Sequence, residues 1–370
     1  MAEPLLIVGA GPTGLAAGLF LAERHIPCRV IDCAERPSTR SRAQVINPRS
    51  LELLEPTGVT AAALKEARPI HRTLFYDGWR QIAELEFGNA HPRFKLSVLP
   101  QLRCEALLAE ALVKHGVEPE HGVMLHSIWQ DDGTVEAALT HSDERVEIVT
   151  TPILFGADGA HSAVRRMLDI EFPGSGFPEL WPLYDIHLDC PLDWESAHVS
   201  FVKNGLVFLL GIRDGVWRVF GDVPDLLDRL PPGTKRGEVI WTSSFHVGHR
   251  VAAREMVGHV AIAGDAAHVH SPVAARGMNL GIEDAYVFAA CAADALDGDL
   301  ERLEDYGRIR HDVHRRVVAR IERLTQLARG RPEIVGFLRS YIIRGLTVLP
   351  PALAMMVELV TGLDHDVKLQ

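Results

Sequence analysis

At 370 residues and 40.8 kDa, the chain has room for two domains or for one domain with a large insertion. Hydrophobic residues make up 47% and charged residues 24%, near the average of globular proteins, so a sizeable core is available. The formal net charge of −11 and the lack of a long basic run argue against a nucleic-acid partner. The five cysteines show neither a Cys-x-x-Cys pair nor zinc-ligand spacing, and we expect a reducing, cytoplasmic location.

The chain begins with a predicted strand, a glycine-rich turn and a helix. Leu5–Val8 is a short continuous apolar run, as expected of a strand that is buried on both faces. In the turn, Gly9 allows a tight bend, Gly11 lets the backbone approach a pyrophosphate, and Gly14 lets the following helix pack against the strand. That helix, roughly Pro12–Arg24, would direct its free N–H groups at the anion.

A second predicted strand supports a nucleotide-binding role for this turn. Cys28–Ile31 is apolar and ends in Asp32. An acidic residue about 20 residues after the glycine turn can accept hydrogen bonds from ribose hydroxyls. A βαβ unit that binds no ligand is the alternative, and the position of Asp32 favours the nucleotide.

The next elements are predicted from apolar runs, alternation and helical periodicity. They are a helix at Leu102–His115, strands at Val123–Ile128, Val135–Thr140, Ile153–Phe155 and Val260–Ala263, a long helical region from near Gly277, and mostly helical structure over Leu300–Gly362.

Two of these strands lead into further glycine–acid motifs. Ile153–Phe155 delivers Gly156-Ala157-Asp158-Gly159, and Val260–Ala263 delivers Gly264-Asp265. Ligands of an open α/β sheet bind outside the carboxyl ends of its strands, where both motifs would lie. Three such motifs in this order predict that the chain wraps an FAD.

The segment Phe177–Gly248 has a different pattern, in which short β-rich runs alternate with turns at Asn204-Gly205 and Asp214-Gly215. We therefore expect an antiparallel sheet inserted into the nucleotide-binding domain, with strands from His71–Phe87 added to it. The fold class is then α/β, a Rossmann-like FAD-binding domain with an inserted, mostly antiparallel substrate domain and C-terminal helices. The expected boundaries are 1–70, 96–176 and 249–335 for the FAD-binding domain, 71–95 and 177–248 for the substrate domain, and 336–370 for a C-terminal helical segment.

Taken together, these motifs resemble those of the group A flavoprotein monooxygenases of the p-hydroxybenzoate hydroxylase family. The resemblance covers about residues 1–330; its motifs are specific for FAD binding and carry little information on the substrate. The matching residues are Gly9, Gly11, Gly14, Asp32, Arg42 with Ala43, Gln101, Asp158-Gly159 with Arg165, Gly264-Asp265-Ala266-Ala267-His268, Pro272, Gly277, Asn279 and Asp284.

The resemblance implies a role for each matched position. Asp32 would bind the adenosine ribose, Arg42 and Gln101 the phosphate and ribityl region, and Asp265 a ribityl hydroxyl. The helix from Gly277 would aim its positive N-terminus at the pyrimidine edge of the flavin and favour the anionic reduced form. The expected catalytic positions are Pro272, Gly277 and Asn279; the expected cofactor-binding residues are Gly9, Gly11, Pro12, Thr13, Gly14, Asp32, Cys33, Arg42, Gln101, Leu125, Asp158, Gly264, Asp265, Gly277, Met278 and Asn279.

The implied chemistry is a monooxygenation. NADPH or NADH would reduce the FAD, O₂ would add to give a C4a-hydroperoxide, and one oxygen atom would pass to an aromatic or heteroaromatic substrate. An epoxidase, a Baeyer–Villiger oxygenase, a flavin-dependent reductase and a non-catalytic flavin-binding protein remain as alternatives. A base would assist a phenolic substrate. The candidates are Tyr184, Asp185, His187, His246 and His249 for the base, and Arg213 and Arg218 for an acidic substrate; no spacing singles one out.

Some features depart from the family pattern or argue against further ligands. Ala274-Ala275 stands where the family often has two glycines that leave room for flavin movement, and Cys33 stands where several members have arginine. His161, His268 and His270 have no carboxylate or cysteine at ligand spacing, so we expect no metal. Ile342–Val360 is apolar, but charged residues and a proline pair interrupt it, so we expect no integral membrane segment. The expected oligomeric state is a monomer or homodimer.

Overall fold

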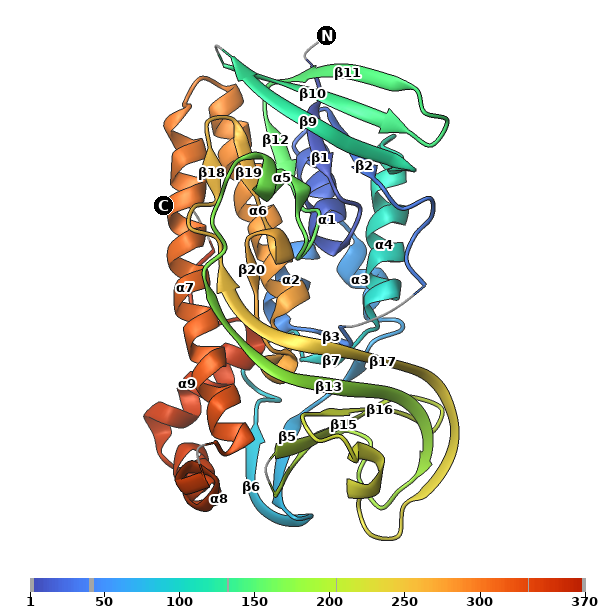
Figure 1. Ribbon diagram of the computed structural model, residues 1–370, viewed down its shortest axis with the longest axis vertical. Helices are drawn as coiled ribbons and strands as arrows, with labels where there is room; N and C mark the ends of the chain where they lie inside the picture. The colour runs from blue at the N-terminus through green and yellow to red at the C-terminus, as the bar shows by residue number, and fades with distance from the viewer. Residues whose placement is uncertain (1–2, 40–42, 132, 204, 332, 368–370) are drawn as a thin grey trace.

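A computed structural model describes residues 3–39, 43–131, 133–203, 205–331 and 333–367. Its first layer is a six-stranded sheet of order β18-β19-β12-β1-β2-β8 (Figure 1). All neighbours pair in parallel except the edge strand β18. The strands are β1 Leu5–Val8, β2 Cys28–Asp32, β8 Glu120–His121, β12 Leu154–Gly156, β18 Met256–Val257 and β19 Val260–Ile262.

The side chains of β1 alternate between two cores. Leu5 and Ile7 pack with helices α1 (Pro12–Ala22), α4 (Gln101–Lys114) and α6 (Gly277–Leu296). Leu6 and Val8 pack on the other face of the sheet, against an antiparallel sheet of β9 (Val123–Asp131), β10 (Thr134–His141) and β11 (Val146–Thr151). Because both faces of β1 are covered, its sequence is a continuous apolar run without alternation.

The second large sheet has eight strands in the order β20-β17-β13-β16-β15-β14-β5-β6. It is antiparallel apart from the β14–β5 pair, and it fills the lower part of Figure 1. Asp214 and Gly215 both have positive φ, as a two-residue hairpin turn requires, whereas Asn204 lies outside the described residues. The strands are β5 Arg72–Asp77, β6 Arg80–Glu86, β13 Gly174–Asp189, β14 Ser196–Val202, β15 Gly205–Arg213, β16 Val216–Gly221, β17 Lys235–Val251 and β20 His268–Val269.

The remaining elements join the two large sheets. Helix α7 (Glu301–Arg329) packs against β18 of the parallel sheet and against β15 and β17 of the second sheet. The others are strands β3 Val45–Ile46, β4 Arg68–Pro69 and β7 Ser97–Val98, helices α2 Pro48–Leu54, α3 Val59–Ala63, α5 Ala163–Met167, α8 Glu333–Val348 and α9 Pro350–Thr361, and 3₁₀ helices η1 Leu226–Arg229, η2 Gly264–Ala266 and η3 Pro272–Ala274.

The architecture agrees with the α/β fold class expected from the sequence. The first helix ends at Ala22 rather than Arg24, because the chain turns at His25, which has a left-handed conformation. The inserted sheet extends beyond the expected boundaries, since β13 starts at Gly174 and β17 continues to Val251 in order to pair with β20. Among the described helices, none is by itself long and apolar enough to cross a membrane; α8 and α9 meet the criteria only as a pair bent by 90°.

Candidate active site

The glycine-rich turn after β1 combines two tightly packed glycines with one that faces open space. Gly9 has φ +110°, and a Cβ there would overlap the carbonyl oxygen of Ala157. A Cβ on Gly14 would overlap the carbonyl oxygen of Gly9. In front of Gly11, by contrast, no atom lies within 4 Å of an added Cβ. The sequence interpretation of the three glycines therefore fits the geometry, because only Gly11 leaves space for a ligand beside the N-terminus of α1.

Asp32 lies directly beside this turn, at the carboxyl end of β2. Its carboxylate accepts hydrogen bonds from the backbone N–H of Ala10 and of Ala34, both at 2.8 Å. These bonds hold an acidic, half-buried group next to the open space at Gly11. The neighbouring Cys33 is exposed.

Gln101 begins helix α4 and contacts the backbone of Ala43. Its Oε1 accepts a hydrogen bond from the Ala43 backbone N–H at 3.2 Å, and its Nε2 donates to Glu105 at 2.8 Å. Arg42, the other expected phosphate contact, lies outside the described residues. Leu125 of β9 is buried in the core between the two upper sheets, with Val8 among its cluster.

The second motif follows β12 and braces the third. Asp158 caps the short helix α5, because its Oδ2 accepts from the backbone N–H of Ala163 at 2.6 Å and of Val164 at 3.1 Å. Arg165 extends from α5 and donates to the carbonyl oxygen of Ala266 at 2.8 Å. Gly159 faces open space, as Gly11 does.

The third motif packs against the first through Thr13. An added Cβ on Gly264 would lie 2.6 Å from the Thr13 Oγ1, and one on Gly281 of α6 would overlap the same atom. Thr13 therefore lies between the Gly264 turn and α6, in a packing position. Asp265, the expected acceptor for a ribityl hydroxyl, is exposed.

Helix α6 begins at Gly277, directly after a left-handed residue. Pro272 opens the 3₁₀ turn η3, and Ala275, which ends it, has φ +52°. The first N–H groups of α6, those of Gly277, Met278 and Asn279, have no acceptor within the helix. Met278 is partly buried against the core of the parallel sheet.

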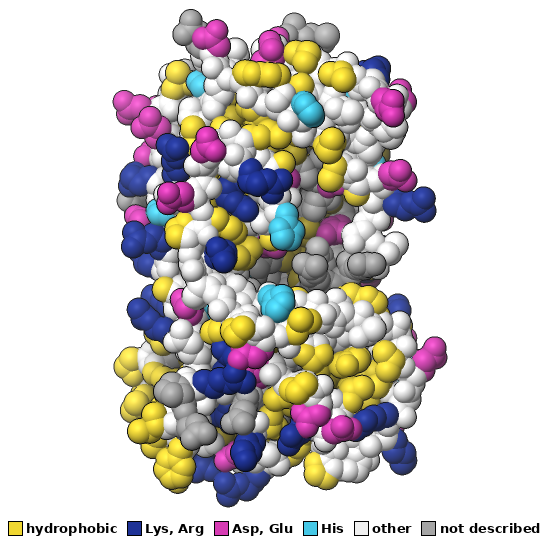
Figure 2. All heavy atoms as spheres, in the orientation of Figure 1, with side chains coloured by type: hydrophobic (Ala, Val, Ile, Leu, Met, Phe, Trp, Pro, Cys, Tyr) yellow, Lys and Arg dark blue, Asp and Glu magenta, His cyan; other side chains and the backbone are white. Residues whose placement is uncertain are grey.

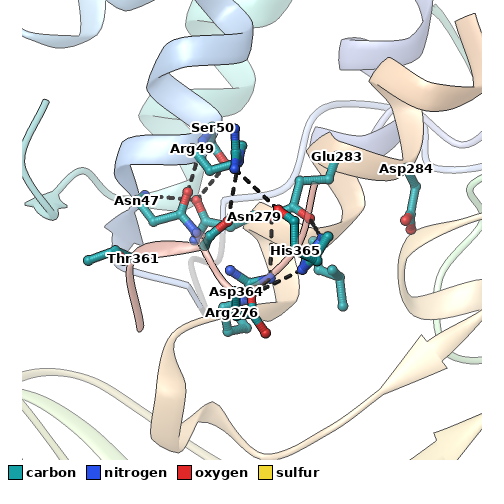
Figure 3. Close-up of polar contacts among 12 residues, drawn as sticks. Asn47, Arg49, Ser50, Arg276, Asn279, Glu283, Asp284, Thr361, Asp364 and His365 are labelled. Atoms are coloured by element: carbon teal, nitrogen blue, oxygen red, sulfur yellow. Dashed lines mark hydrogen bonds and ion pairs between the residues drawn. The ribbon is translucent and has the colours of Figure 1, made fainter. Parts of the chain in front are cut away.

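The Asn279 side chain is fully occupied by the protein (Figure 3). Its Oδ1 accepts from the Asn47 backbone N–H at 2.9 Å and from the Ser50 hydroxyl at 2.8 Å. Its Nδ2 donates to the carbonyl oxygens of Val45 at 3.0 Å and Ala275 at 2.9 Å. The side chain therefore holds the first turn of α6 and the strained Ala275 in place, which leaves only the backbone of Asn279 for a ligand.

These parts meet in one region of the molecule. The carboxyl ends of β1, β2 and β12 point toward the junction between the two large sheets, where α6 begins (Figure 1). The face shown in Figure 2 is hollowed between its upper and lower halves, next to this junction. Open space at two glycines, helix N–H groups that have no acceptor within their helix, and an exposed acid are the donor and acceptor set that a dinucleotide with a polyhydroxyl chain requires.

Comparison with known proteins identifies the family. Residues 3–204 and 225–321 match the family described as "FAD binding domain". The chain belongs to this family. The relationship to the group A flavoprotein monooxygenases that the motifs predicted is thereby confirmed.

Similar proteins in the family are monooxygenases. The 6-methylpretetramide 4-monooxygenase of Streptomyces rimosus is 35% identical over 346 residues, which cover 87% of this chain and 62% of that protein. Pentachlorophenol 4-monooxygenase of Sphingobium chlorophenolicum is 28% identical over 76% of this chain and 56% of its own length. The chain thus spans less than two thirds of these relatives.

Solved structures show the same fold. p-Nitrophenol 4-monooxygenase PnpA from Pseudomonas putida DLL-E4 has a TM-score of 0.86 at 20% identity, over 97% of this chain and 98% of that chain. The flavin-dependent monooxygenase PieE, solved in complex with FAD and substrate, has a TM-score of 0.81 at 22% identity, over 98% of this chain and 71% of that chain.

A buried charge cluster lies behind the Gly264 turn of this FAD-binding protein. Asp284 of α6 accepts from the Gly264 backbone N–H at 2.9 Å, and its carboxylate also contacts His268 at 2.9 Å and both His314 and Arg310 at 2.7 Å. His314 in turn contacts Glu255 at 2.7 Å. All five side chains are essentially inaccessible to solvent. The cluster ties the loop of the third motif to helices α6 and α7.

The protonation of this cluster is set by its ion pairs. Burial opposes a charge on His314, but the carboxylates of Asp284 and Glu255 outweigh it and raise the pKa of His314 to about 9. Burial likewise opposes ionisation of Asp284, yet His314 and Arg310 hold its pKa well below the usual range. His268, His314 and Asp284 could ligate a metal by their spacing. The Arg310 guanidinium already neutralises the Asp284 oxygen that contacts His314, so the geometry favours a salt-bridge cluster.

Glu255 of this cluster was not predicted from the sequence, and neither were its two members on α7, Arg310 and His314. They lie four residues apart on α7, on the same face as the buried Tyr306, whose hydroxyl donates to the Ile262 carbonyl at 2.9 Å. A polar residue at every fourth position of one helix face was therefore the available signal. Asp284 was recognised as a motif residue, but the expectation that His268 has no carboxylate at ligand spacing is wrong, because the fold brings Asp284, 16 residues later, to 2.9 Å from its ring.

The candidate bases and candidate substrate-binding arginines of the eight-stranded sheet differ in their burial and in their contacts. Asp185 and Arg218 face each other across β13 and β16 and form a bidentate ion pair, with both contacts at 2.8 Å. They neutralise each other, so neither is a free base or a free cation. His249 is buried against the edge of the Phe177 ring, and neither ring nitrogen has a described hydrogen-bond partner. Of the others, Tyr184 is half-buried, and His187, His246 and Arg213 are exposed.

Proposed function

We propose that the protein is an FAD-dependent, NAD(P)H-consuming monooxygenase that hydroxylates an aromatic or heteroaromatic substrate. The observation that carries this proposal is the convergence of three glycine–acid motifs and the N-terminus of α6 on one junction between two sheets. The names of similar proteins support the reaction type, since one is a 6-methylpretetramide 4-monooxygenase and another a pentachlorophenol 4-monooxygenase.

Each part of the junction has a role in this proposal. The open space at Gly11 and the N-terminus of α1 would hold the pyrophosphate, and Asp32 would bind the adenosine ribose. The exposed Asp265 would accept a hydrogen bond from a ribityl hydroxyl. The free N–H groups at Gly277–Asn279 would lie at the pyrimidine edge of the ring and stabilise negative charge there. When bound, FAD would supply the redox and oxygen-transfer chemistry.

The protein would exclude water and position the substrate. We propose that residues 177–248 cover the ring from below and carry most substrate contacts, with Pro272 beside the reactive face. A polycyclic phenol is the substrate class that we favour, because a pretetramide monooxygenase is 35% identical to this chain. We further propose a cytoplasmic protein, monomeric or homodimeric, that uses NADH or NADPH.

The test uses the purified chain. We expect a yellow protein with FAD bound, and NAD(P)H oxidation that accelerates when a suitable phenol from a panel of simple and polycyclic phenols is added. Incubation with isotopically labelled O₂ should place one labelled oxygen atom in the product. Substrate turnover without O₂ consumption would instead indicate a flavin-dependent reductase, and a colourless protein that does not take up FAD would overturn the proposal.

A further inference from the structure

The last described residues of the chain return to the first turn of α6. After α9 ends at Thr361, Gly362 turns the chain with φ +81°. Arg49 of α2 then donates to the carbonyl oxygens of Gly362 at 3.3 Å and His365 at 3.2 Å. Val367 is buried in the core of the parallel sheet. We call residues 362–367 the C-terminal tail. It is fixed by the hydrogen bonds from Arg49 and by the burial of Val367.

The tail brings two polar side chains to a buried arginine (Figure 3). Arg276 immediately precedes α6, and its side chain is fully buried. Its guanidinium has no hydrogen-bond partner among the described residues. Its Nη2 lies 3.3 Å from Asp364 Oδ1 in the tail and 3.4 Å from Glu283 Oε1 in α6. A buried guanidinium is costly without an anion beside it, so these two carboxylates are what make its burial tolerable.

His365 joins the two carboxylates. Its Nε2 lies 2.7 Å from Glu283 Oε2, and its Nδ1 lies 3.0 Å from Asp364 Oδ1. Burial opposes ionisation of both acids, but Arg276 and His365 hold the pKa values of Glu283 and Asp364 below their usual range. Two further cations face the group: Arg320 lies 3.3 Å from Asp364, and Arg310 lies 3.6 Å from Glu283.

The same contacts reach the residues that hold the start of α6. A Cβ on Gly362 would lie 2.5 Å from Asn47 Nδ2 and 2.7 Å from Arg276 Nη1, so the tail backbone packs directly on both. The backbone N–H of Asn47 in turn donates to Asn279, which also binds Ala275. A displacement of the tail would therefore also displace the first turn of α6, although Gly277 and Gly362 are 85 positions apart in the sequence.

We propose that Asp364 and His365 of the C-terminal tail are positioning residues for the flavin site, which hold Arg276 and the N-terminus of α6 in place and set the charge beside the flavin ring. This inference rests on the proposed function, because that proposal places the pyrimidine edge of the ring at Gly277–Asn279. Neither residue need touch the cofactor. Both act through Arg276 and Glu283, and through the backbone contacts of Gly362.

The test compares Asp364→Asn, His365→Gln and Arg276→Gln with the parent chain and with Asp305→Asn. The control removes the charge of the partly exposed Asp305 on α7, which pairs with Arg308 and Arg302 outside this network. For each protein we would measure the FAD dissociation constant, the midpoint potential of the bound flavin and the melting temperature of the apoprotein. We expect Asp364→Asn and His365→Gln to weaken FAD binding about tenfold, the effect of losing about 1.4 kcal/mol, and the control to leave it unchanged.

The direction in which the midpoint potential changes distinguishes a positioning role of the tail from a general effect on stability. Asp364→Asn leaves Arg276 less compensated and should raise the midpoint potential, because positive charge near the ring favours the reduced anion. Arg276→Gln should lower it. If the tail variants melt at a lower temperature but keep the parental FAD affinity and potential, the tail is only structural and the inference is overturned. If Asp364→Asn does not fold, His365→Gln decides by the same two readouts. A parent chain that binds no FAD would overturn the proposed function instead.

Discussion

The two large sheets of this protein use their polar side chains in opposite ways. At the carboxyl edge of the parallel sheet, the Asp265 side chain is exposed and Gly11 faces open space. In the eight-stranded sheet, Asp185 and Arg218 lie opposite each other on neighbouring strands and neutralise each other. At the strand ends of the parallel sheet, polar groups face the proposed ligand site, whereas a polar residue within an antiparallel sheet acquires its role from the strand beside it.

The largest expected effect is the loss of FAD affinity when Gly11, at the carboxyl edge of the parallel sheet, is replaced. Gly11→Val should lower FAD affinity by more than about 100-fold, since a side chain would fill the space for the pyrophosphate. The apoprotein should stay folded, because no atom lies within 4 Å of an added Cβ. The matched variant Gly14→Val should fail to fold, as its side chain would overlap the Gly9 carbonyl. FAD titration and circular dichroism measure both; normal FAD affinity in Gly11→Val would contradict the assignment.

The second prediction concerns the ion pair of the other sheet. Asp185→Ala leaves the nearly buried Arg218 without its carboxylate and should destabilise the protein by about 3 kcal/mol. FAD affinity should not change, because the pair lies within the eight-stranded sheet, whereas the glycine–acid motifs follow strands of the parallel sheet. Urea denaturation gives the stability. A variant of parental stability that has lost activity would show that Asp185 acts as a base after all.

The third prediction tests the exposed acid of the parallel sheet. Asp265→Ala should weaken FAD binding by about 1–3 kcal/mol through the loss of one acceptor. Apoprotein stability should change little, because the side chain is exposed without the cofactor. Equilibrium dialysis at low FAD concentration measures the affinity. Full FAD occupancy under those conditions would remove Asp265 from the site.

The fourth prediction follows from the buried cluster behind the Gly264 turn. The folded-state pKa of His314 is raised from 6.5 to about 9, so its stabilising charge is fully present below pH 6.5 and is lost as pH rises through 9. The free energy of unfolding should therefore fall between these values, by about 1.4 kcal/mol per pH unit more than in His314→Gln. Denaturation at several pH values measures the slopes. Equal slopes would mean that His314 is neutral in the folded protein.

The last prediction concerns the turn before α6, where the expected effect on stability is small. Ala275 has φ +52°, so Ala275→Gly should relieve strain and stabilise the protein by up to about 1 kcal/mol. Combined with Ala274→Gly, it should change the rate of flavin reduction by NAD(P)H more than FAD affinity. We also expect reduction to be slow without substrate and faster with it. Stopped-flow absorbance tests both; loss of FAD with an unchanged rate would mean that these residues do not border the ring.

The elements around the first motif were predictable from the sequence because their determinants are local. Leu5–Val8, Gly9, Gly14 and Asp32 each contribute through neighbours in one βαβ unit, and the structure reproduces their strand, turn and helix. The parallel sheet buries both faces of its strands, so continuous apolar runs in the sequence predict that layers cover the sheet on both sides.

Only the tertiary structure decided which residues that are distant in sequence pair with one another. Asn279 was expected at the reaction site, yet its side chain binds residues around Asn47, and Thr13 packs on Gly264. Arg310 and His314 acquire their role from Asp284, and Arg276 from Asp364. An ion pair or hydrogen bond depends on distances of about 3 Å, which helical or strand periodicity does not encode. The sequence by itself therefore determined the glycine–acid motifs and the strands that they follow, and the packing of α6, α7 and the C-terminal tail decided which charged side chains pair with one another.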